Sequence, residues 1–334
     1  MKQKLLAFLI ALTAVLTAAG CTGKPEKTNE SFMAMDTFMQ LDVYGDSGAA
    51  KQIRDRITAL DKLLSATDKD ADIFRLNRDG AATADEATAD VLEQSLRLCK
   101  STGGALDVTV FPIVEAWGFI SKDYRIPSKE QLKTLLALTD YRAVRLNGNE
   151  VTLPKGAKVD LGAVAKGYAA DEAVKILDGS DSKSAILNLG GTVVAYGSKN
   201  GAPWKVGVAD PTDSADYMGY LSLNDKIVAT SGSYERYFTA ADGTVYSHIL
   251  DPSTGCPVNN GIVSVTVISD SGVRCDGLST ALFVMGKEKA ADYYHAHRDF
   301  DFVILTDDGK AYVTGGIAEN FTVADGHSVK VEVI

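Results

Sequence analysis

The sequence predicts an α+β fold, a single domain with a largely antiparallel sheet and flanking helices. Segments with helical periodicity dominate the first half of the chain, whereas strand-like segments dominate the second half. No sustained alternation of strand, helix and strand appears, which argues against a parallel sheet. Asn147-Gly148 lies between two short strand-like segments and is a strong signal for a β-hairpin. We find no internal repeat.

The expected helices carry apolar residues three and four positions apart, and cover residues 49–64, 87–99, 131–138, 163–177 and 278–285. Ser128 and Gln131 form a capping box that predicts the start of the third helix. The expected strands are 39–44, 143–146, 151–153, 185–189, 192–196, 204–208, 228–230, 245–250, 263–268 and 302–305.

The amino terminus predicts a lipoprotein signal peptide over residues 1–20. Lys2 and Lys4 precede an apolar run that is too short to span a membrane comfortably, and small residues lead directly into Cys21. This arrangement resembles a bacterial lipoprotein signal, in which Cys21 becomes lipidated; simple cleavage and release is the alternative. We therefore expect a polar tether over 21–31, a globular domain over 32–334, and a protein anchored at the extracytoplasmic face of the cell membrane.

Composition limits the range of partners. With 46% hydrophobic residues the chain can bury a large core, and its net charge of −10 argues against nucleic acid or an anionic membrane surface as a partner. Any phosphate-bearing ligand must therefore be held by local groups. Beyond Cys21 only Cys99, Cys256 and Cys275 remain, an odd number that cannot form a complete disulfide framework. The sequence leaves open whether Cys256 and Cys275 form a disulfide.

Residues 159–167 read as a strand end that turns into a helix. The first turn of a helix has unpaired backbone N–H groups and the positive end of the helix dipole, so it can bind phosphate. Lys166 would lie one turn inside this helix, which makes the segment a candidate site for a pyrophosphate. The segment matches neither the Walker nor the Rossmann glycine pattern. The alternative is an ordinary capped helix with a solvated lysine.

Residues 275–280 are expected to open another helix. The spacing of four places the Asp276 carboxylate and the Thr280 hydroxyl on one face, and such hard oxygens suit Mg²⁺. The alternative is that Asp276 only caps the helix. A second acidic cluster, Asp68, Asp70 and Asp72, imitates the start of an EF-hand loop. It lacks the glycine and the final glutamate that this calcium loop requires.

Taken together, these segments resemble the ApbE family of FAD:protein FMN transferases over nearly the whole mature chain. The matching segments, in order, are 35–37, 65–77, 104–110, 117–119, 160–167, 188–191, 229–237, 248–255 and 276–286.

The resemblance implies that the Asp276 carboxylate, the Thr280 hydroxyl and the backbone carbonyl of Ala163 bind Mg²⁺. It also implies a pocket for FAD, and Thr67 stands there where many relatives carry an aromatic residue that stacks on the flavin. The implied lining residues are Met35, Thr67, Ala105, Leu106, Asp107, Asp160, Lys166 and Ile249.

The implied reaction cleaves the FAD pyrophosphate and attaches FMN to a Thr or Ser of a membrane-associated redox protein, with AMP as the leaving group. Asp160 and His248 are candidates for the group that orients or deprotonates the acceptor hydroxyl; the general base is unknown. Residues 231–237 either shape the acceptor entrance or form a tight strand connection. An FAD pyrophosphatase and a non-catalytic flavin-binding lipoprotein are the alternative functions.

Overall fold

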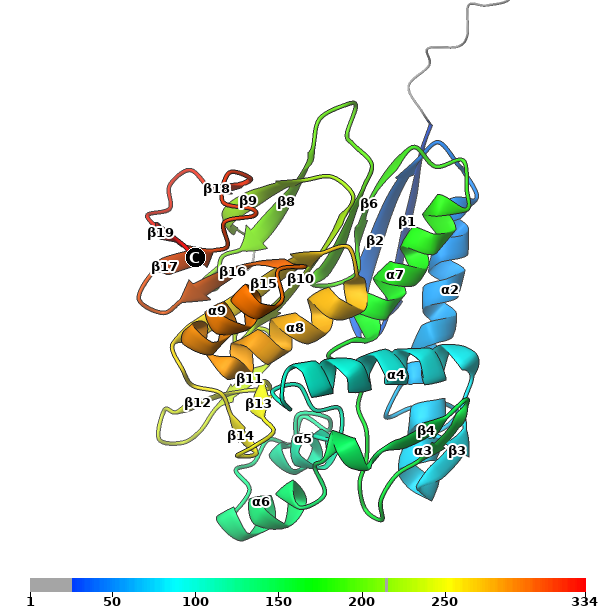
Figure 1. The fold of residues 1–334 in the computed structure, drawn as a ribbon, viewed down its shortest axis with the longest axis vertical. Helices are drawn as coiled ribbons and strands as arrows, with labels where there is room; N and C mark the ends of the chain where they lie inside the picture. Colours follow the sequence, from blue (N-terminus) through cyan, green and yellow to red (C-terminus); the bar gives the residue numbers. More distant parts are fainter. Residues whose placement is uncertain (1–25, 214–215) are drawn as a thin grey trace, which may run out of the picture.

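A nine-stranded sheet forms the centre of the molecule in the computed structural model, which describes residues 26–213 and 216–334 (Figure 1). Its strand order is β1-β2-β6-β7-β10-β15-β16-β17-β19, and β17 and β19 are its one parallel pair within these residues. The strands are β1 (Lys27–Ala34), β2 (Thr37–Tyr44), β6 (Ser184–Asn188), β7 (Thr192–Tyr196), β10 (Lys226–Gly232), β15 (Ile262–Ser269), β16 (Asp301–Thr306), β17 (Lys310–Val313) and β19 (Lys330–Val333). The prediction of an α+β fold with a largely antiparallel sheet is confirmed.

Both faces of this sheet are covered. Helices lie on one face, and a smaller sheet of β8 (Trp204–Ala209), β9 (Tyr217–Leu223) and β18 (Phe321–Val323) packs on the other. In β16, Phe302 and Ile304 face the helices, whereas Val303 and Leu305 face the smaller sheet. Because side chains alternate along a strand, burial of both faces explains the continuous apolar runs of the central strands.

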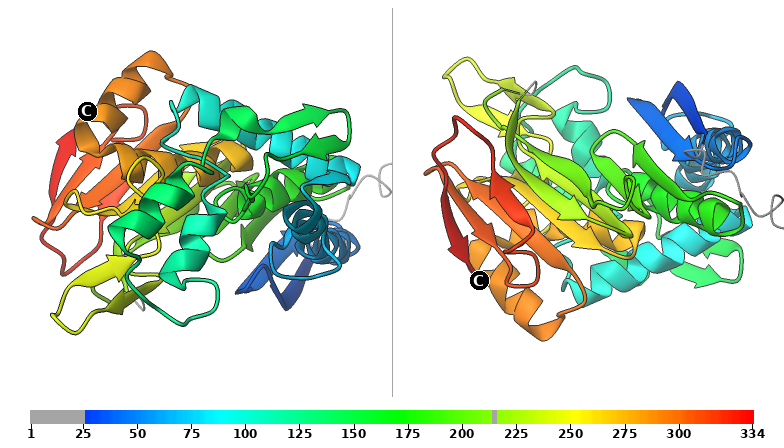
Figure 2. Two further views of the ribbon diagram at one scale, coloured as in Figure 1. Left: turned by 90° about the horizontal axis from the view of Figure 1, so that it is seen from below. Right: turned by 90° about the horizontal axis from the view of Figure 1, so that it is seen from above.

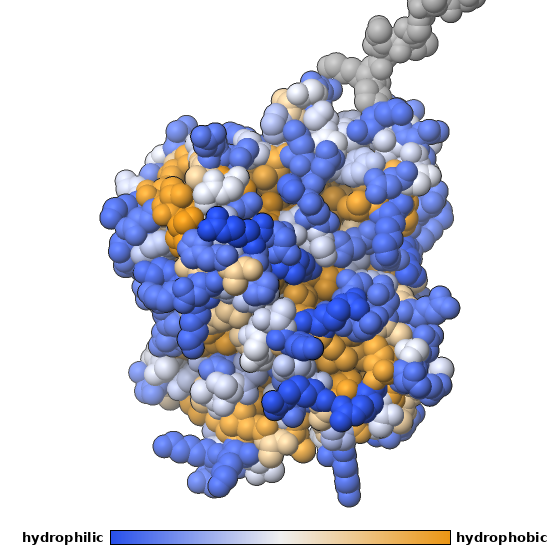
Figure 3. Space-filling model, viewed as in Figure 1, coloured by the Kyte–Doolittle hydropathy of each residue, from blue (hydrophilic) through white to orange (hydrophobic). Residues whose placement is uncertain are grey.

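The helices are α2 (Ala49–Leu64), α3 (Asp72–Asp79), α4 (Glu86–Ser101), α5 (Phe111–Trp117), α6 (Lys129–Leu136), α7 (Ala165–Asp178), α8 (Gly272–Met285), α9 (Lys287–Ala296) and the 3₁₀ turn η1 (Tyr141–Ala143). The prediction for α2 is confirmed in both bounds, as is the capping box of Ser128 and Gln131. Helices α3, α5 and α9 were not predicted. Polar side chains cover much of the helix-bearing side of the molecule (Figure 3).

Four of the predicted helices begin at other residues than predicted. Helix α4 begins one residue early, at Glu86, and α6 begins two residues early, at Lys129. The larger differences at α8 and α7 have clear causes. Helix α8 starts at Gly272, six residues early, because apolar residues on nearly all of its sides are buried and no amphipathic stripe marks its first turns. Helix α7 starts two residues later than predicted, because Asp160 accepts a hydrogen bond from the backbone N–H of Gly162 and holds the preceding residues in a turn.

The remaining strands form small sheets beside the main one. They are β3 (Ala81–Thr83), β4 (Arg145–Asn147), β5 (Glu150–Thr152), β11 (Tyr237–Thr239), β12 (Val245–Ser247), β13 (Leu250–Asp251) and β14 (Cys256–Pro257). The predicted hairpin exists, but its turn is one residue later, since Asn147 pairs with Glu150 and Gly148-Asn149 form the turn.

The tether prediction is wrong for residues 27–31, which belong to β1. This strand pairs with the whole of β2, from Lys27 opposite Tyr44 to Ala34 opposite Thr37. The strand lacks the apolar alternation by which a strand is recognised in sequence. Its polar side chains instead form ion pairs at the sheet edge, such as Lys27 with Asp42. The signal peptide, Cys21 and the first part of the tether lie outside the described residues. Within the described part of the chain, no helix is long and apolar enough to cross a membrane.

All three described cysteines are free. Cys256 is exposed, whereas Cys275 is buried in α8 and its thiol donates a hydrogen bond to the carbonyl of Ile227. The question of a Cys256–Cys275 disulfide, left open by the sequence, is therefore answered: the two thiols are unpaired.

Candidate active site

One pocket contains every residue predicted for the FAD site, the metal site and the acceptor hydroxyl. It lies where the start of α7 and the second and third turns of α8 meet the β1–β2 turn and the segments before α5 and after β12. The predicted residues that line it are Met35, Thr67, Ala105, Leu106, Asp107, Asp160, Ala163, Lys166, His248, Ile249, Asp276 and Thr280.

The pocket depends on a very close crossing of α7 and α8. A Cβ atom added to Gly167 would lie 2.1 Å from the carbonyl oxygen of Gly272, and one added to Gly272 would lie 2.1 Å from that of Gly167. Both distances are far below van der Waals contact, so only glycine fits at either position. This crossing brings Asp276 of α8 onto the first turn of α7.

Each of these two helices caps the other. The Asp171 carboxylate of α7 accepts hydrogen bonds from the backbone N–H groups of Gly272 and Val273, at 2.6 and 3.0 Å. The Asp276 carboxylate of α8 accepts one from the N–H of Gly167 at 2.9 Å, in a helix that has no side-chain cap of its own. The alternative that Asp276 caps its own helix is wrong, because Ser271 takes that position.

The second oxygen of Asp276 faces the pocket. Oδ1 lies 3.8 Å from Nζ of Lys166, which extends from the first turn of α7. Burial raises the pKa of Asp276, while the Lys166 charge and the N–H groups at the start of α7 favour the ionised form. A buried carboxylate with a cation at this distance, beside a helix start, can receive both a divalent metal and a phosphate group.

The donor set around Asp276 fits Mg²⁺. Thr280 lies one turn further along α8, with its hydroxyl 3.2 Å from that of Ser231, and Ala163 lies two residues before the start of α7. All three predicted ligands offer hard oxygen atoms, as Mg²⁺ prefers. Among the described residues no three His, Cys, Asp or Glu side chains converge as a metal site. The predicted Mg²⁺ ligands are not a cluster of that kind, because they comprise one carboxylate, one hydroxyl and one backbone carbonyl.

Burial shifts the pKa values of the two candidates for the general base in opposite directions. Burial raises the pKa of Asp160, and the Arg236 and Lys166 charges only partly oppose this shift. Desolvation lowers the pKa of His248 to about 4, with Arg236 and Lys166 acting in the same direction. His248 is therefore neutral at pH 7. Its Nδ1 lies 3.1 Å from the carbonyl oxygen of Arg236 and must carry the proton, which leaves the lone pair of Nε2 free to accept one.

The predicted flavin side of the pocket is shaped by tight turns. Met35 and Asp36 both have positive φ, 50° and 59°, at the tip of the β1–β2 hairpin. The Thr37 side chain beside them packs against Gly190, so closely that a Cβ atom on Gly190 would lie 2.2 Å from the Thr37 hydroxyl oxygen. Asp107 has a structural task, since its carboxylate accepts hydrogen bonds from the N–H and hydroxyl of Thr109.

The sequence did not single out several pocket residues, among them Glu235, Arg236 and Phe119. The charged pair belongs to residues 231–237, for which two roles were left open. The strand-connection role is confirmed, because the segment joins β10 to β11, and Ser231, Glu235 and Arg236 in it also line the pocket. Burial raises the pKa of Glu235, against the opposing effect of Lys166.

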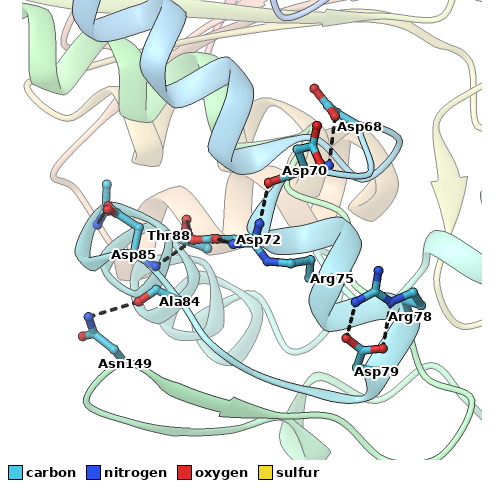
Figure 4. Close-up of polar contacts among 11 residues, drawn as sticks. Asp68, Asp70, Asp72, Arg75, Arg78, Asp79, Ala84, Asp85, Thr88 and Asn149 are labelled. Carbon is cyan, nitrogen blue, oxygen red and sulfur yellow. Dashed lines mark hydrogen bonds and ion pairs between the residues drawn. The ribbon is translucent and has the colours of Figure 1, made fainter.

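The acidic cluster that imitates an EF-hand lies elsewhere and has a structural role (Figure 4). The buried Asp72 carboxylate forms an ion pair with Arg75 and accepts hydrogen bonds from the N–H of Asp85 and the hydroxyl of Thr88, at 2.7 and 2.9 Å. Asp68 accepts one from the N–H of Asp70. These contacts join α3 to the start of α4.

Comparisons with known proteins agree with this geometry. The ApbE family profile matches residues 35–304. A FAD:protein FMN transferase from Vibrio cholerae serotype O1 is 33% identical over 320 residues, which cover 90% of this chain and 95% of that protein. The crystal structure of the ApbE protein from Thermotoga maritima is 31% identical with a TM-score of 0.82, covering 88% of this chain and 99% of that chain. The apo form of the flavinyl transferase ApbE from Pseudomonas stutzeri is 26% identical with a TM-score of 0.80, covering 91% and 99%.

The fold and the pocket thus define an α+β protein in which a buried carboxylate and a lysine meet at the start of a helix. The profile match and the extent of these similarities establish the family: the chain belongs to the ApbE family.

Proposed function

We propose that this protein is a Mg²⁺-dependent FAD:protein FMN transferase, held by a lipid on Cys21 at the extracytoplasmic face of the cell membrane. The observation that carries the proposal is the meeting of Lys166, the Asp276 carboxylate and the start of α7 in one pocket. The similar relative from Vibrio cholerae bears the same activity in its name.

Asp276, Thr280 and the carbonyl of Ala163 would hold Mg²⁺, which when bound neutralises the charge that develops on a transferring phosphoryl group. Lys166 and the N–H groups at the start of α7 supply fixed positive charge to the same pyrophosphate. Met35, Thr67, Ala105, Leu106 and Ile249 would bind the flavin part of FAD.

In the proposed reaction a Thr or Ser hydroxyl oxygen of the acceptor protein attacks the FMN phosphorus. A new O–P bond forms, the P–O bond to the AMP phosphate breaks, and the hydroxyl proton leaves the acceptor. Asp160 has the raised pKa that favours taking this proton, whereas Nε2 of neutral His248 is free to orient the hydroxyl. Both are proposed roles.

Product analysis tests this function. The chain without residues 1–21 is incubated with FAD, Mg²⁺ and a candidate acceptor domain, and AMP and covalently bound flavin are measured together. The proposal predicts equal amounts of both products and loss of both with EDTA. AMP without covalent flavin would establish an FAD pyrophosphatase, and intact FAD would establish a flavin-binding protein.

A further inference from the structure

We infer that the acceptor protein binds as an extra strand along β11, at the mouth of the pocket. This inference rests on the proposed function, because the polypeptide that would dock is the acceptor of that reaction. Hairpin β11–β12 projects from the same side of the molecule as hairpin β1–β2, whose tip lines the pocket (Figure 2).

Strand β11 has a free backbone edge. The N–H of His248 bonds to the carbonyl of Arg236, and the N–H of Ala240 bonds to the carbonyl of Thr244. In an antiparallel pair, hydrogen-bonded and non-hydrogen-bonded positions alternate. The N–H and C=O groups of Tyr237 and Thr239 therefore point away from β12, and within the described residues β11 pairs with no other strand.

The outer edge of β12 is less accessible near the pocket. Ser247, the residue of β12 next to the pocket, is buried with 5% of its surface exposed. Tyr237, directly opposite it in the register, is 51% exposed. An approaching chain therefore finds its open edge on β11, within one residue of the pocket residue Arg236.

Exposed apolar side chains continue from this edge into the pocket. Phe238 of β11 stacks on Tyr124 with ring centroids 5.0 Å apart, and Phe119 contacts both rings. Phe119 and Ile120 line the pocket, and Ile120 and Tyr124 remain 38% and 40% exposed. The surface formed by Ile120, Tyr124 and the β11 edge is thus continuous with the site of the proposed reaction.

This surface fits one kind of partner, an extended segment that carries the Thr or Ser between apolar side chains. Backbone hydrogen bonds to β11 would supply affinity, and apolar contacts would supply specificity, as in other cases of strand addition. Such docking would place the acceptor hydroxyl beside Arg236 and His248.

A pair of proline substitutions tests the inference. Thr239→Pro removes an outward N–H of β11, and Val245→Pro removes the equivalent N–H of β12 at the paired position. Proline is tolerated on an edge strand where its missing N–H faces outward. Steady-state FMN transfer is measured against acceptor concentration, FAD affinity by flavin fluorescence, and folding by thermal denaturation. Tyr237→Ser serves as a second variant if proline unfolds the hairpin.

We expect Thr239→Pro to raise KM for the acceptor about five- to tenfold, the effect of one lost hydrogen bond. Tyr237→Ser should raise it severalfold, Val245→Pro should leave it unchanged, and FAD affinity should not move in any variant. Equal KM values for wild type, Thr239→Pro and Tyr237→Ser, or equal losses in both proline variants, would overturn the inference. Failure of the wild type to form covalent flavin would instead overturn the proposed function.

Discussion

Asp276 has two tasks that a single substitution can separate. One oxygen caps α7 through Gly167, and the other faces Lys166 and the proposed metal. Asp276→Asn keeps a carbonyl oxygen for the cap but removes the charge. We expect FMN transfer to fall by about two orders of magnitude or more, as for other charge-stabilising groups, while the free energy of unfolding changes by less than about 1 kcal/mol. Transfer kinetics and urea denaturation provide the measurements. Unchanged transfer would exclude Asp276 from the reaction.

Thr67 offers a test of how the flavin is bound. It lies at the pocket wall, exposed, with its hydroxyl 3.2 Å from that of Ser65. An aromatic ring at this position would stack on the isoalloxazine and add about 0.5–1.5 kcal/mol of binding free energy. Thr67→Tyr should therefore tighten FAD binding roughly two- to tenfold in fluorescence titrations, with Thr67→Ser as the unchanged control. Weaker binding by the tyrosine variant would show that the flavin does not lie against Thr67.

The titration of His248 gives a prediction with a definite sign. Its folded pKa of about 4 lies below the ordinary value of 6.5, so the ring is neutral in the folded state above about pH 5. The unfolded chain takes up this proton first as the pH falls, so the stability contributed by neutral His248 is lost between about pH 6.5 and 4. NMR of histidine-labelled protein should show one ring with a midpoint near 4, absent in His248→Gln. A midpoint near 6.5 for that ring would contradict the account.

At the scale of elements, the crossing of α7 and α8 determines the geometry of the site. Gly167→Ala would push a methyl group into the carbonyl of Gly272 and against Cβ of Asp276, 2.1 and 2.8 Å away. We expect a loss of about 1–3 kcal/mol in the free energy of unfolding, together with reduced FMN transfer because Asp276 is displaced. Gly179→Ala, at the end of the same helix, meets no atom closer than 3.4 Å and is the matched control. Equal stability of the two variants would mean that the crossing tolerates a side chain.

The elements also show what could be predicted from sequence. Helix α2 is amphipathic and was located in both bounds, and Ser128 identified the start of α6. Helix α8 is buried on nearly all sides, so its first turns carry no periodic signal. Strand β1 is too polar to be recognised, since its pairing with β2 and its ion pairs replace an apolar pattern.

The candidate site, like the fold, was predictable only where a local sequence pattern or the family resemblance marks its residues. Each predicted residue type was found by its local pattern or by family resemblance, but the contact that joins α8 to the start of α7 links Gly167 to Asp276, 109 residues apart. No local pattern encodes such a contact. Arg236 and Glu235 were missed as individual residues because their place in the pocket depends on where β10 ends and β11 begins.

At the scale of the whole molecule, the proposed anchor determines where the enzyme works. Cys21→Ser removes the proposed site of lipidation, and we expect the protein to move from the membrane fraction to the soluble fraction of cells. Cys256→Ser, which removes an exposed free thiol of the folded domain, should leave the distribution unchanged. Immunoblots of separated fractions provide the measurement. Membrane association that survives Cys21→Ser would contradict lipid anchoring.

The central claim is that the pocket at the crossing of α7 and α8 transfers FMN to protein. The intact mass of an acceptor domain, recorded after incubation with this enzyme, FAD and Mg²⁺, tests it most directly. The account predicts a mass increase equal to one FMN phosphoester, located on a Thr or Ser and absent with Asp276→Asn. An acceptor of unchanged mass, although FAD has been converted to AMP and FMN, would contradict it.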